Sequence, residues 1–278
     1  MADTAFQTMY RQELIAGFER RQSILRQTCT TEGVMKGNAI VFDVIDSGGA
    51  AAQTRGVNGL IPARTDNNTQ YTCTLTEWHD LAKKTGYNVF ASQGDQRGAM
   101  QDTTMAVINR KVDDQIITEL ATATNFAGLA ATTLSMQLMT RTLAILGNNN
   151  VPIDGNLSGV ISPAGWAYLM QIKEVTSKDY VNDTKLLDAP LRFRWAGVTW
   201  LVHSAVPGVG TASETLFVYH KSAIGHGMNT AGIQSPVGYD EEQDYSWARC
   251  SAYMGAKLLQ NSGVVCIRHD GSGMAATA

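Results

Sequence analysis

Charged residues are scarce in this sequence. They make up 17% of its 278 residues, whereas an average soluble domain has about 25%. The net charge is −3, and neither end carries a run of lysine and arginine that would neutralise phosphates in bulk. Tight, direct nucleic-acid binding is therefore not expected. A surface with few charges is poorly protected against association, which favours a protein whose surface is partly covered by neighbouring molecules.

The sequence also has few cysteines, and the four present, Cys29, Cys73, Cys250 and Cys266, lie far apart. Without a Cys-x-x-Cys pair, the spacing fits neither a zinc site nor a disulfide framework. No stretch of about eighteen apolar residues exists, and the polar start MADTAFQTMYRQ lacks the apolar core of a signal peptide. We therefore expect a protein that is made in a reducing cytoplasm, stays soluble there and does not contact a membrane.

Motifs for catalysis, phosphate binding or metal binding are absent as well. His220 and His226 would share a face on a strand, but no third ligand is spaced nearby, and Gly225 and Gly227 favour a loop. Residues 208–213 lack the Gly-Lys-Ser/Thr of a phosphate-binding loop, and no nucleophile elbow occurs. We expect no catalytic residue, no metal site and no cofactor.

An acidic cluster near the end of the chain offers a second candidate metal site. It consists of Asp240, Glu241, Glu242 and Asp244. Carboxylates bind Ca²⁺, but this cluster lacks the alternating ligands and the central glycine of a calcium loop. A solvated turn, or a salt-bridge partner for arginines of another subunit, is the preferred interpretation.

The first part of the chain has the spacing of an amphipathic helix. Over residues 4–27 apolar side chains recur every three or four positions, and Asp3 or Thr4 can cap the start. The apolar side consists of Phe6, Met9, Tyr10, Leu14, Phe18 and Leu25. The helix is expected to end near Gly33 and Gly37, and it can dock on its own domain or equally on a neighbour.

Two strands follow, with a long loop between them. Residues 40–45 are rich in β-branched side chains, and residues 71–76 alternate apolar side chains with threonine, so the two are expected to pair. More than twenty residues rich in Gly, Ala, Asn and Thr separate them, which is unusually long inside a compact domain. A disordered tip would explain this length. So would a two-stranded arm that becomes ordered on an adjacent subunit, reaching about 30 Å at roughly 3.3 Å per residue.

The longest helix is predicted over residues 99–122. Its apolar stripe is formed by Met105, Ile108, Val112, Ile116 and Leu120. The charged residues expected off this stripe are Arg110, Lys111, Asp113, Asp114 and Glu119. A second helix, over 133–146, is predicted to stop at Gly147 and the asparagines at 148–150.

The section 151–236 has a different pattern, in which short strand-like pieces alternate with one short helix near residues 164–172. The expected strands are 157–162, 191–195, 198–204 and 215–220, with a hairpin turn at Ala196-Gly197. This pattern is typical of a small α/β domain inserted in the chain.

The end of the chain returns to long strands. One face of the first strand carries Tyr245, Trp247, Arg249, Ser251 and Tyr253, and the other carries Ala248, Cys250, Ala252 and Met254. We expect the small-residue face to lie against the long helix. A turn at residues 261–263 then leads into a last strand, 264–267.

This order of elements resembles the coat protein of tailed bacteriophages with the Hong Kong 97-type capsid fold. At the residue level the resemblance is carried by GFERRQSILRQTCTTEGVMKGN, TRGVNGLIPARTDNNTQYTCTLTEWHDLAKKTGYNVFASQGD and DYSWARCSAYMGAKLLQNSGVVCIRHD. It covers essentially the whole chain. It implies an α+β fold with an N-terminal arm, an extended E-loop hairpin, a peripheral (P) domain with a long spine helix, and an axial (A) domain.

The resemblance also implies how the chain is divided. Residues 1–35 would be the N-terminal arm and residues 36–76 the E-loop. The P domain would hold residues 77–148 and 237–278, and the A domain, at the centre of the capsomer, residues 149–236.

Two departures from the family pattern matter. Some relatives join their subunits by a Lys–Asn isopeptide bond whose lysine lies in the E-loop. Residues 47–70 contain Arg55 and Arg64 but no lysine, so this bond is not expected here. Other relatives carry a scaffolding segment ahead of the arm. Because the arm begins almost at Met1, any scaffold is expected to be a separate protein or to have been removed before Met1.

The function implied by the resemblance is structural. The chain would be a major capsid protein, not an enzyme, that self-assembles into pentamers and hexamers of an icosahedral head enclosing double-stranded DNA. Its partners would be further copies of itself, a separate scaffolding protein, a portal and a decoration protein, with only weak, non-specific contact to DNA. The residues expected at intersubunit contacts are Arg55, Arg64, Arg20, Arg21, Asp240, Glu241 and Glu242. Two alternatives remain: a cellular nanocompartment shell of the same fold, and a cytoplasmic α+β enzyme without a recognisable motif.

Overall fold

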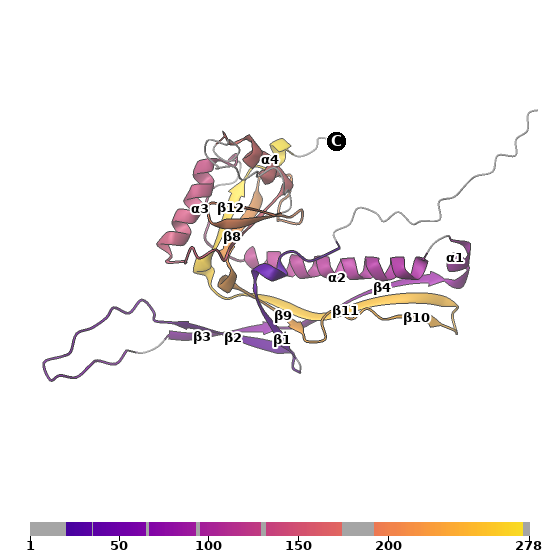
Figure 1. The fold of residues 1–278 in the computed structure, drawn as a ribbon, viewed down its shortest axis with the longest axis horizontal. Helices are drawn as coiled ribbons and strands as arrows, with labels where there is room; N and C mark the ends of the chain where they lie inside the picture. The colour runs from indigo at the N-terminus through magenta and orange to yellow at the C-terminus, as the bar shows by residue number, and fades with distance from the viewer. Residues whose placement is uncertain are drawn as a thin grey trace, which may run out of the picture.

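A computed structural model of the chain describes residues 21–34, 36–64, 67–92, 95–128, 132–173 and 192–274. The molecule is elongated. A long helix and a long sheet run along it, a smaller sheet with its own helices stands on one side, and a loop projects from one end (Figure 1). Within the described ranges, no helix has both the length and the apolar character needed to cross a membrane.

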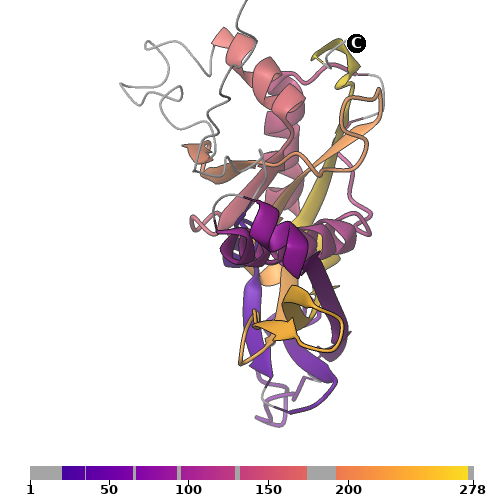
Figure 2. The ribbon, with the colours of Figure 1, turned by 90° about the vertical axis from the view of Figure 1, so that its right-hand side faces the viewer.

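The larger sheet, called the spine sheet here, forms the long axis. Its strand order is β1-β9-β11-β10, with β4 paired to β11. These strands are β1 (Thr30–Val34), β4 (Thr76–Thr85), β9 (Ile224–Asn229), β10 (Val237–Asp240) and β11 (Tyr245–Leu258). After the short helix α1 (Gly86–Ala91), the helix α2 (Gln96–Leu120) runs back along one face of the sheet (Figures 1 and 2). The predicted long helix is therefore confirmed.

One face of α2 packs on β11, as the small side chains of that strand predicted. Ile108 and Val112 of the helix belong to the same buried cluster as Ala252 of the strand. Small side chains on β11 allow the helix to approach the strand closely, and dense packing of this kind is what stabilises a protein core. Two predictions about α2 were wrong: Met105 is 37% exposed, and Asp113, expected off the apolar stripe, is fully buried.

The smaller sheet has the strand order β12-β8-β5-β7-β6. Its strands are β5 (Leu157–Ile161), β6 (Arg192–Trp195), β7 (Val198–Val202), β8 (Glu214–His220) and β12 (Val264–His269), accompanied by the helices α3 (Met136–Asn148) and α4 (Pro163–Gln171). Short 3-10 helices lie at η3 (Lys221–Ala223), η4 (Asn261–Gly263) and η5 (Ser272–Met274). Ala196 and Gly197 have φ values of 52° and 77° and connect β6 to β7, which confirms the predicted hairpin turn.

Two strands join a different sheet from the one that their position in the chain indicates. β9 lies within the segment 149–236 but pairs with β1 and β11 in the spine sheet. β12 lies near the C-terminus but pairs with β8 in the small sheet. The chain therefore passes between the two sheets once more than an inserted domain would require.

The remaining two strands form a separate hairpin at the end where the loop projects. β2 (Ala39–Asp46) pairs with β3 (Asn67–Thr74) in antiparallel register, which confirms the predicted pairing. Cys73 is buried while the threonines at 72 and 74 are exposed, as the alternation predicted. Between the strands, residues 47–64 extend away from the body of the molecule (Figure 1).

The predicted helix over residues 4–27 falls mostly on residues 1–20, which lie outside the described residues. For residues 21–29, called the anchor segment here, the prediction was wrong. Residues 21–25 are not helical, η1 (Arg26–Thr28) is a 3-10 helix, and β1 occupies the position where the α-helix was expected to end. The physical reason is that backbone N–H groups of this segment bond to a buried side chain instead of to helix carbonyls.

Candidate functional site

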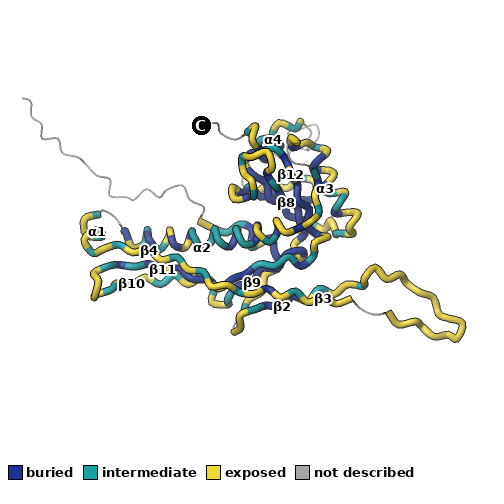
Figure 3. Tube along the Cα trace, turned by 180° about the vertical axis from the view of Figure 1, so that it is seen from behind, coloured by how far each residue is buried: buried dark blue, intermediate teal, exposed yellow. Residues whose placement is uncertain are grey.

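The projecting loop carries the two arginines singled out from the sequence. Every residue from Gly48 to Arg64 is exposed (Figure 3), and the tip turns at Gly56, whose carbonyl accepts the N–H of Gly59 at 2.9 Å. The large apolar side chains exposed on this tip are Val57, Leu60 and Ile61. An apolar tip flanked by Arg55 and Arg64 is suited to docking, because apolar burial gives affinity and the charges give direction.

The acidic cluster forms the turn between β10 and β11, at the end of the molecule opposite to the loop (Figure 1). Asp240 accepts the N–H of Gln243 at 3.1 Å and that of Glu242 at 3.0 Å, and the bond from Gln243 is the main reason why the pKa of Asp240 is below its ordinary value. The side chains of Glu241 and Glu242 face solvent. The turn therefore presents a cluster of carboxylates to solvent.

The other two predicted contact residues lie near the start of the chain. Arg20 falls outside the described residues. The exposed Arg21 has its Nη1 3.9 Å from Oδ2 of Asp102 in the same chain. Such an exposed pair contributes little to stability, so Arg21 can exchange this partner for another at low cost.

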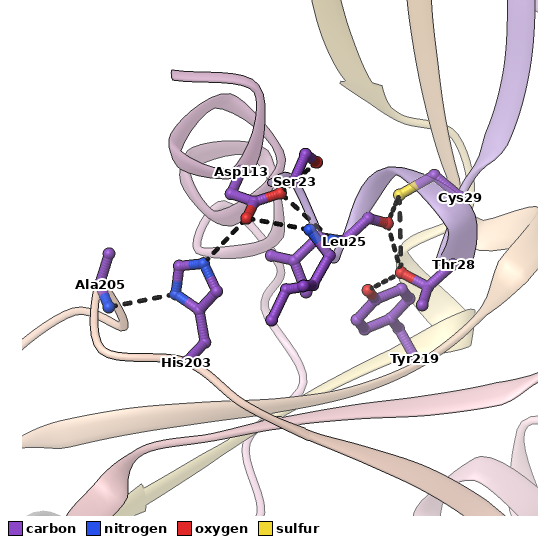
Figure 4. Close-up of polar contacts among 9 residues, drawn as sticks. Ser23, Leu25, Thr28, Cys29, Asp113, His203, Ala205 and Tyr219 are labelled. Atoms are coloured by element: carbon purple, nitrogen blue, oxygen red, sulfur yellow. Dashed lines mark hydrogen bonds and ion pairs between the residues drawn. The ribbon is translucent and has the colours of Figure 1, made fainter. Parts of the chain in front are cut away.

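A buried carboxylate joins three parts of the chain (Figure 4). Oδ1 of Asp113, on α2, accepts the hydroxyl of Ser23 at 2.5 Å and the N–H of Leu25 at 3.2 Å. Its Oδ2 accepts the N–H of Ile24 at 3.3 Å and lies 3.2 Å from Nε2 of His203. A buried charge is tolerated only when donors surround it. This carboxylate therefore fastens the anchor segment to α2.

His203 directly follows β7 of the small sheet, and its ring is neutral. Nδ1 accepts the backbone N–H of Ala205 at 3.1 Å, so this nitrogen carries no proton. The proton is on Nε2, which donates to Asp113 (Figure 4). The small sheet is thus bonded to α2 through the same carboxylate that holds the anchor segment.

The anchor segment also contacts the small sheet directly. The hydroxyls of Thr28 and Tyr219, the latter on β8, are 2.5 Å apart. Burial raises the pKa of Tyr219 well above its ordinary value, and burial raises the pKa of the Cys29 thiol to about 12. Both groups are neutral at physiological pH, so neither adds a charge to the surroundings of Asp113.

Serine, aspartate and histidine meet here, but in the wrong order for catalysis. A nucleophilic serine needs its hydroxyl bonded to the imidazole, with the carboxylate behind the imidazole. Here the carboxylate of Asp113 lies between Ser23 and His203 and accepts from both. The side chains of Asp113 and His203 are also 0% exposed. The arrangement holds parts of the chain together and does not activate a nucleophile.

The comparison with protein families decides between the candidate functions. A family model described as phage capsid protein matches residues 2–271 of the 278. The chain belongs to the phage capsid protein family. It is a structural major capsid protein, and its place is the head of a phage virion. Family and fold together imply a structural, non-enzymatic role.

Solved structures agree with this assignment at the level of the fold. A chain of Mycobacterium phage Che8 superposes with a TM-score of 0.74 at 15% identity, covering 96% of this chain and 98% of that one. The capsid of Cyanophage P-SCSP1u gives 0.72 at 11% identity, with 95% and 93% covered, and the capsid of Ralstonia phage GP4 gives 0.69 at 10%, with 96% of both covered. A search of curated protein sequences finds no match.

The two histidines weighed as metal ligands lie on strands of different sheets in the capsid subunit. His220 lies at the end of β8, with Nε2 3.3 Å from Asp154, whereas His226 lies inside β9. The loop expected around His226 was wrong, because Gly225 and Gly227 are strand residues: a Cβ on Gly225 would lie 2.9 Å from the Phe42 ring. Within the described residues, no three His, Cys, Asp or Glu side chains form a group that would hold a metal ion.

Asp113 and His203 are the functional residues that the sequence reasoning missed. A signal for Asp113 existed: it lies four and seven positions before Ile117 and Leu120, which are both buried. An acidic side chain in line with apolar ones on a long helix is expected to be buried and paired. No comparable pattern marks His203, because its partner lies 90 residues away in the sequence.

His226 gives the capsid subunit a built-in sensitivity to acid. Its side chain is fully buried, and neither ring nitrogen has a hydrogen-bond partner among the described residues. Burial, and to a smaller degree the charge of Arg26, lowers its pKa from 6.5 to about 4. The unfolded chain therefore binds this proton first as the pH falls, so stability is lost between about pH 6.5 and pH 4 and no further below that. The shift corresponds to about 3 kcal/mol.

We expect His226→Leu to remove this acid sensitivity. The free energy of unfolding in urea, measured at pH 7 and at pH 4, should fall by about 3 kcal/mol more in the wild-type chain than in the variant. Other groups titrate in the same range, but they are present in both chains and cancel in the difference. Equal losses in the two chains would show that His226 is protonated in the folded state at little cost.

Proposed function

We propose that the capsid subunits join head to tail, with the projecting loop of one copy lying on the acidic turn of the next. The observation that carries this proposal is the placement of opposite charges at opposite ends of an elongated subunit: Arg55 and Arg64 at one end, Asp240, Glu241 and Glu242 at the other. Such a contact is heterologous, and heterologous contacts close into rings. Rings of five and six subunits would then build an icosahedral head that encloses double-stranded DNA.

The parts of the chain take the roles that the family resemblance implies. In this proposal β2, β3 and the loop between them are the E-loop, and α2 with the spine sheet is the P domain. The small sheet is the A domain. The pairing of β9 with β11 supports assigning β9 to the P domain, and the pairing of β12 with β8 supports assigning β12 to the A domain. Residues 1–35 remain the proposed N-terminal arm.

We further propose that the subunit is made in the cytoplasm of the bacterial host and works with a separate scaffolding protein, a portal and a decoration protein. Contact with the packaged DNA would be weak and non-specific. The net charge of −3 supports this last point, because a wall that is not basic does not hold DNA back as it is packed.

Negative-stain electron microscopy of the purified chain, paired with size-exclusion chromatography, tests the proposed assembly. We expect closed shells, tubes, or rings of five and six subunits. DNA inside particles isolated from cells would fit a phage head, whereas a bound cargo enzyme would favour a nanocompartment. A 30.0 kDa monomer that never assembles, even with crowding agents or added scaffold, would contradict the proposal.

A further inference from the structure

The carboxylate of Asp113 is shared between two parts of the capsid subunit, the anchor segment and the small sheet. Oδ1 accepts hydrogen bonds from Ser23 and Leu25 of the anchor segment. Oδ2 accepts a hydrogen bond from His203, which follows β7 of the small sheet, and another from the N–H of Ile24 in the anchor segment. Both partners are thus held on α2 by one carboxylate in the C-terminal half of that helix.

We propose that Asp113 couples two contacts of α2: the binding of the anchor segment and the position of the small sheet. Two donors that share one buried anion each stabilise it, so losing one of them changes the energy of binding the other. When the small sheet moves away from α2, His203 leaves, and the anion loses one of its donors. The donors of the anchor segment must then offset more of the cost of burying the charge. The anchor segment therefore binds more weakly to α2.

The coupling gives a subunit two linked arrangements instead of two independent ones. In one arrangement, both the small sheet and the anchor segment are hydrogen-bonded to Asp113 of α2. In the other, both contacts are released, because packed elements have discrete arrangements and do not deform continuously. The inference concerns contacts within one chain, so it does not depend on the loop-to-turn contact proposed above.

Cys29 provides a direct readout of the anchor segment. Its side chain is 1% exposed, and its thiol donates to the carbonyl of Leu25 at 3.4 Å. A thiol reagent therefore reaches this side chain only when the anchor segment detaches from α2. Cys250, which lies on β11 and is 0% exposed, reports the opening of the spine sheet in the same sample, so the ratio of the two labelling rates separates local release from general unfolding.

The test is the rate of labelling of Cys29 relative to Cys250 by iodoacetamide, read for each site by mass spectrometry on the purified full-length chain. We expect His203→Ala to raise the ratio about tenfold, because it removes one hydrogen bond to a charged group. In an Asp113→Asn background His203→Ala should not raise it. Asparagine has one accepting oxygen instead of two, and so cannot serve both partners.

The matched control is the second buried histidine–carboxylate pair. His269 and Glu214, both 0% exposed with Nε2 and Oε1 3.6 Å apart, lie on neighbouring strands of the small sheet. His269→Ala should leave the ratio unchanged. An unchanged ratio in His203→Ala, a rise that persists in the Asp113→Asn background, or an equal rise in His269→Ala would each overturn the inference.

A second variant covers the case in which His203→Ala does not fold. Coupling is reciprocal, so Ser23→Ala should loosen the small sheet on α2. Cys266 reports this movement, because its sulfur on β12 lies 3.9 Å from the carbonyl of Leu120 at the end of α2. We expect the labelling of Cys266 relative to Cys250 to rise about threefold in Ser23→Ala, and an unchanged ratio would overturn the inference.

Discussion

Reversing the charge of the loop, with Arg55→Glu and Arg64→Glu together, is expected to abolish assembly. The loop would then present two carboxylates to the carboxylates of Glu241 and Glu242, and juxtaposed like charges cost several kcal/mol at an interface. One exposed ion pair is worth about 0–1 kcal/mol, but every subunit of a shell repeats the contact, so the effect accumulates. Electron microscopy should show no shells or rings, and size-exclusion chromatography should show monomers.

Reversing the other end as well is expected to restore the shells. A chain that carries Glu241→Arg and Glu242→Arg in addition to the two loop substitutions has the same pair of opposite charges with the signs exchanged. The salt dependence of assembly should be unchanged too, because the same number of pairs is screened. Failure of the fourfold variant to assemble, with its fold intact by circular dichroism, would contradict a direct contact between the loop and the turn.

A mixture of two variants, one with only the loop charges reversed and one with only the turn charges reversed, tests whether the contact joins neighbours within a ring. A loop-reversed chain and a turn-reversed chain fail alone but match each other, so they should assemble by alternating. A ring of six can alternate two kinds of subunit, whereas a ring of five cannot. The mixture should therefore give rings of six, sheets or tubes without closed five-fold vertices. Closed shells from the mixture would place the contact between rings instead of within them.

The parts of this fold that the sequence predicted are those governed by local spacing. The 3.6-residue repeat that includes Ile108 and Val112 predicted α2, and the alternation around Cys73 predicted β3. The small side chains of β11 predicted which face meets the helix, because only one face of that strand lets a helix approach closely. Each of these signals depends on residues that are neighbours along the chain.

The parts that were missed depend on partners distant in sequence. The anchor segment has a helical spacing, but Asp113 removes its backbone N–H groups from helix formation. The glycines of β9 looked like loop residues because the side chains that need their empty space, Phe42 at Gly225 and Ile40 at Gly227, lie on another sheet. For the same reason, the sequences of β9 and β12 do not indicate that β9 joins the spine sheet and β12 the small sheet.

Replacing the central carboxylate, with Asp113→Ala, is expected to cost about 3–5 kcal/mol of unfolding free energy. Truncation leaves the hydroxyl of Ser23, the N–H of Leu25 and Nε2–H of His203 without their acceptor, and Leu25 and His203 are buried. Removing one partner of a buried charged pair typically costs about this much. The measurement is the midpoint and slope of urea unfolding for the two purified chains at pH 7.

Asp114→Ala is the matched control, because it removes the same charge from the same turn of α2 at a partly exposed position. A surface substitution of this kind usually changes stability by less than about 0.5 kcal/mol. If Asp113→Ala costs no more than Asp114→Ala, the buried carboxylate does not hold the subunit together. If it costs the expected amount, the stability of the capsid subunit depends on one side chain where the anchor segment, α2 and the small sheet meet. The same substitution should then impair assembly even though Asp113 lies far from the loop and from the acidic turn, because a subunit that loses this junction no longer presents its two ends in a fixed relation.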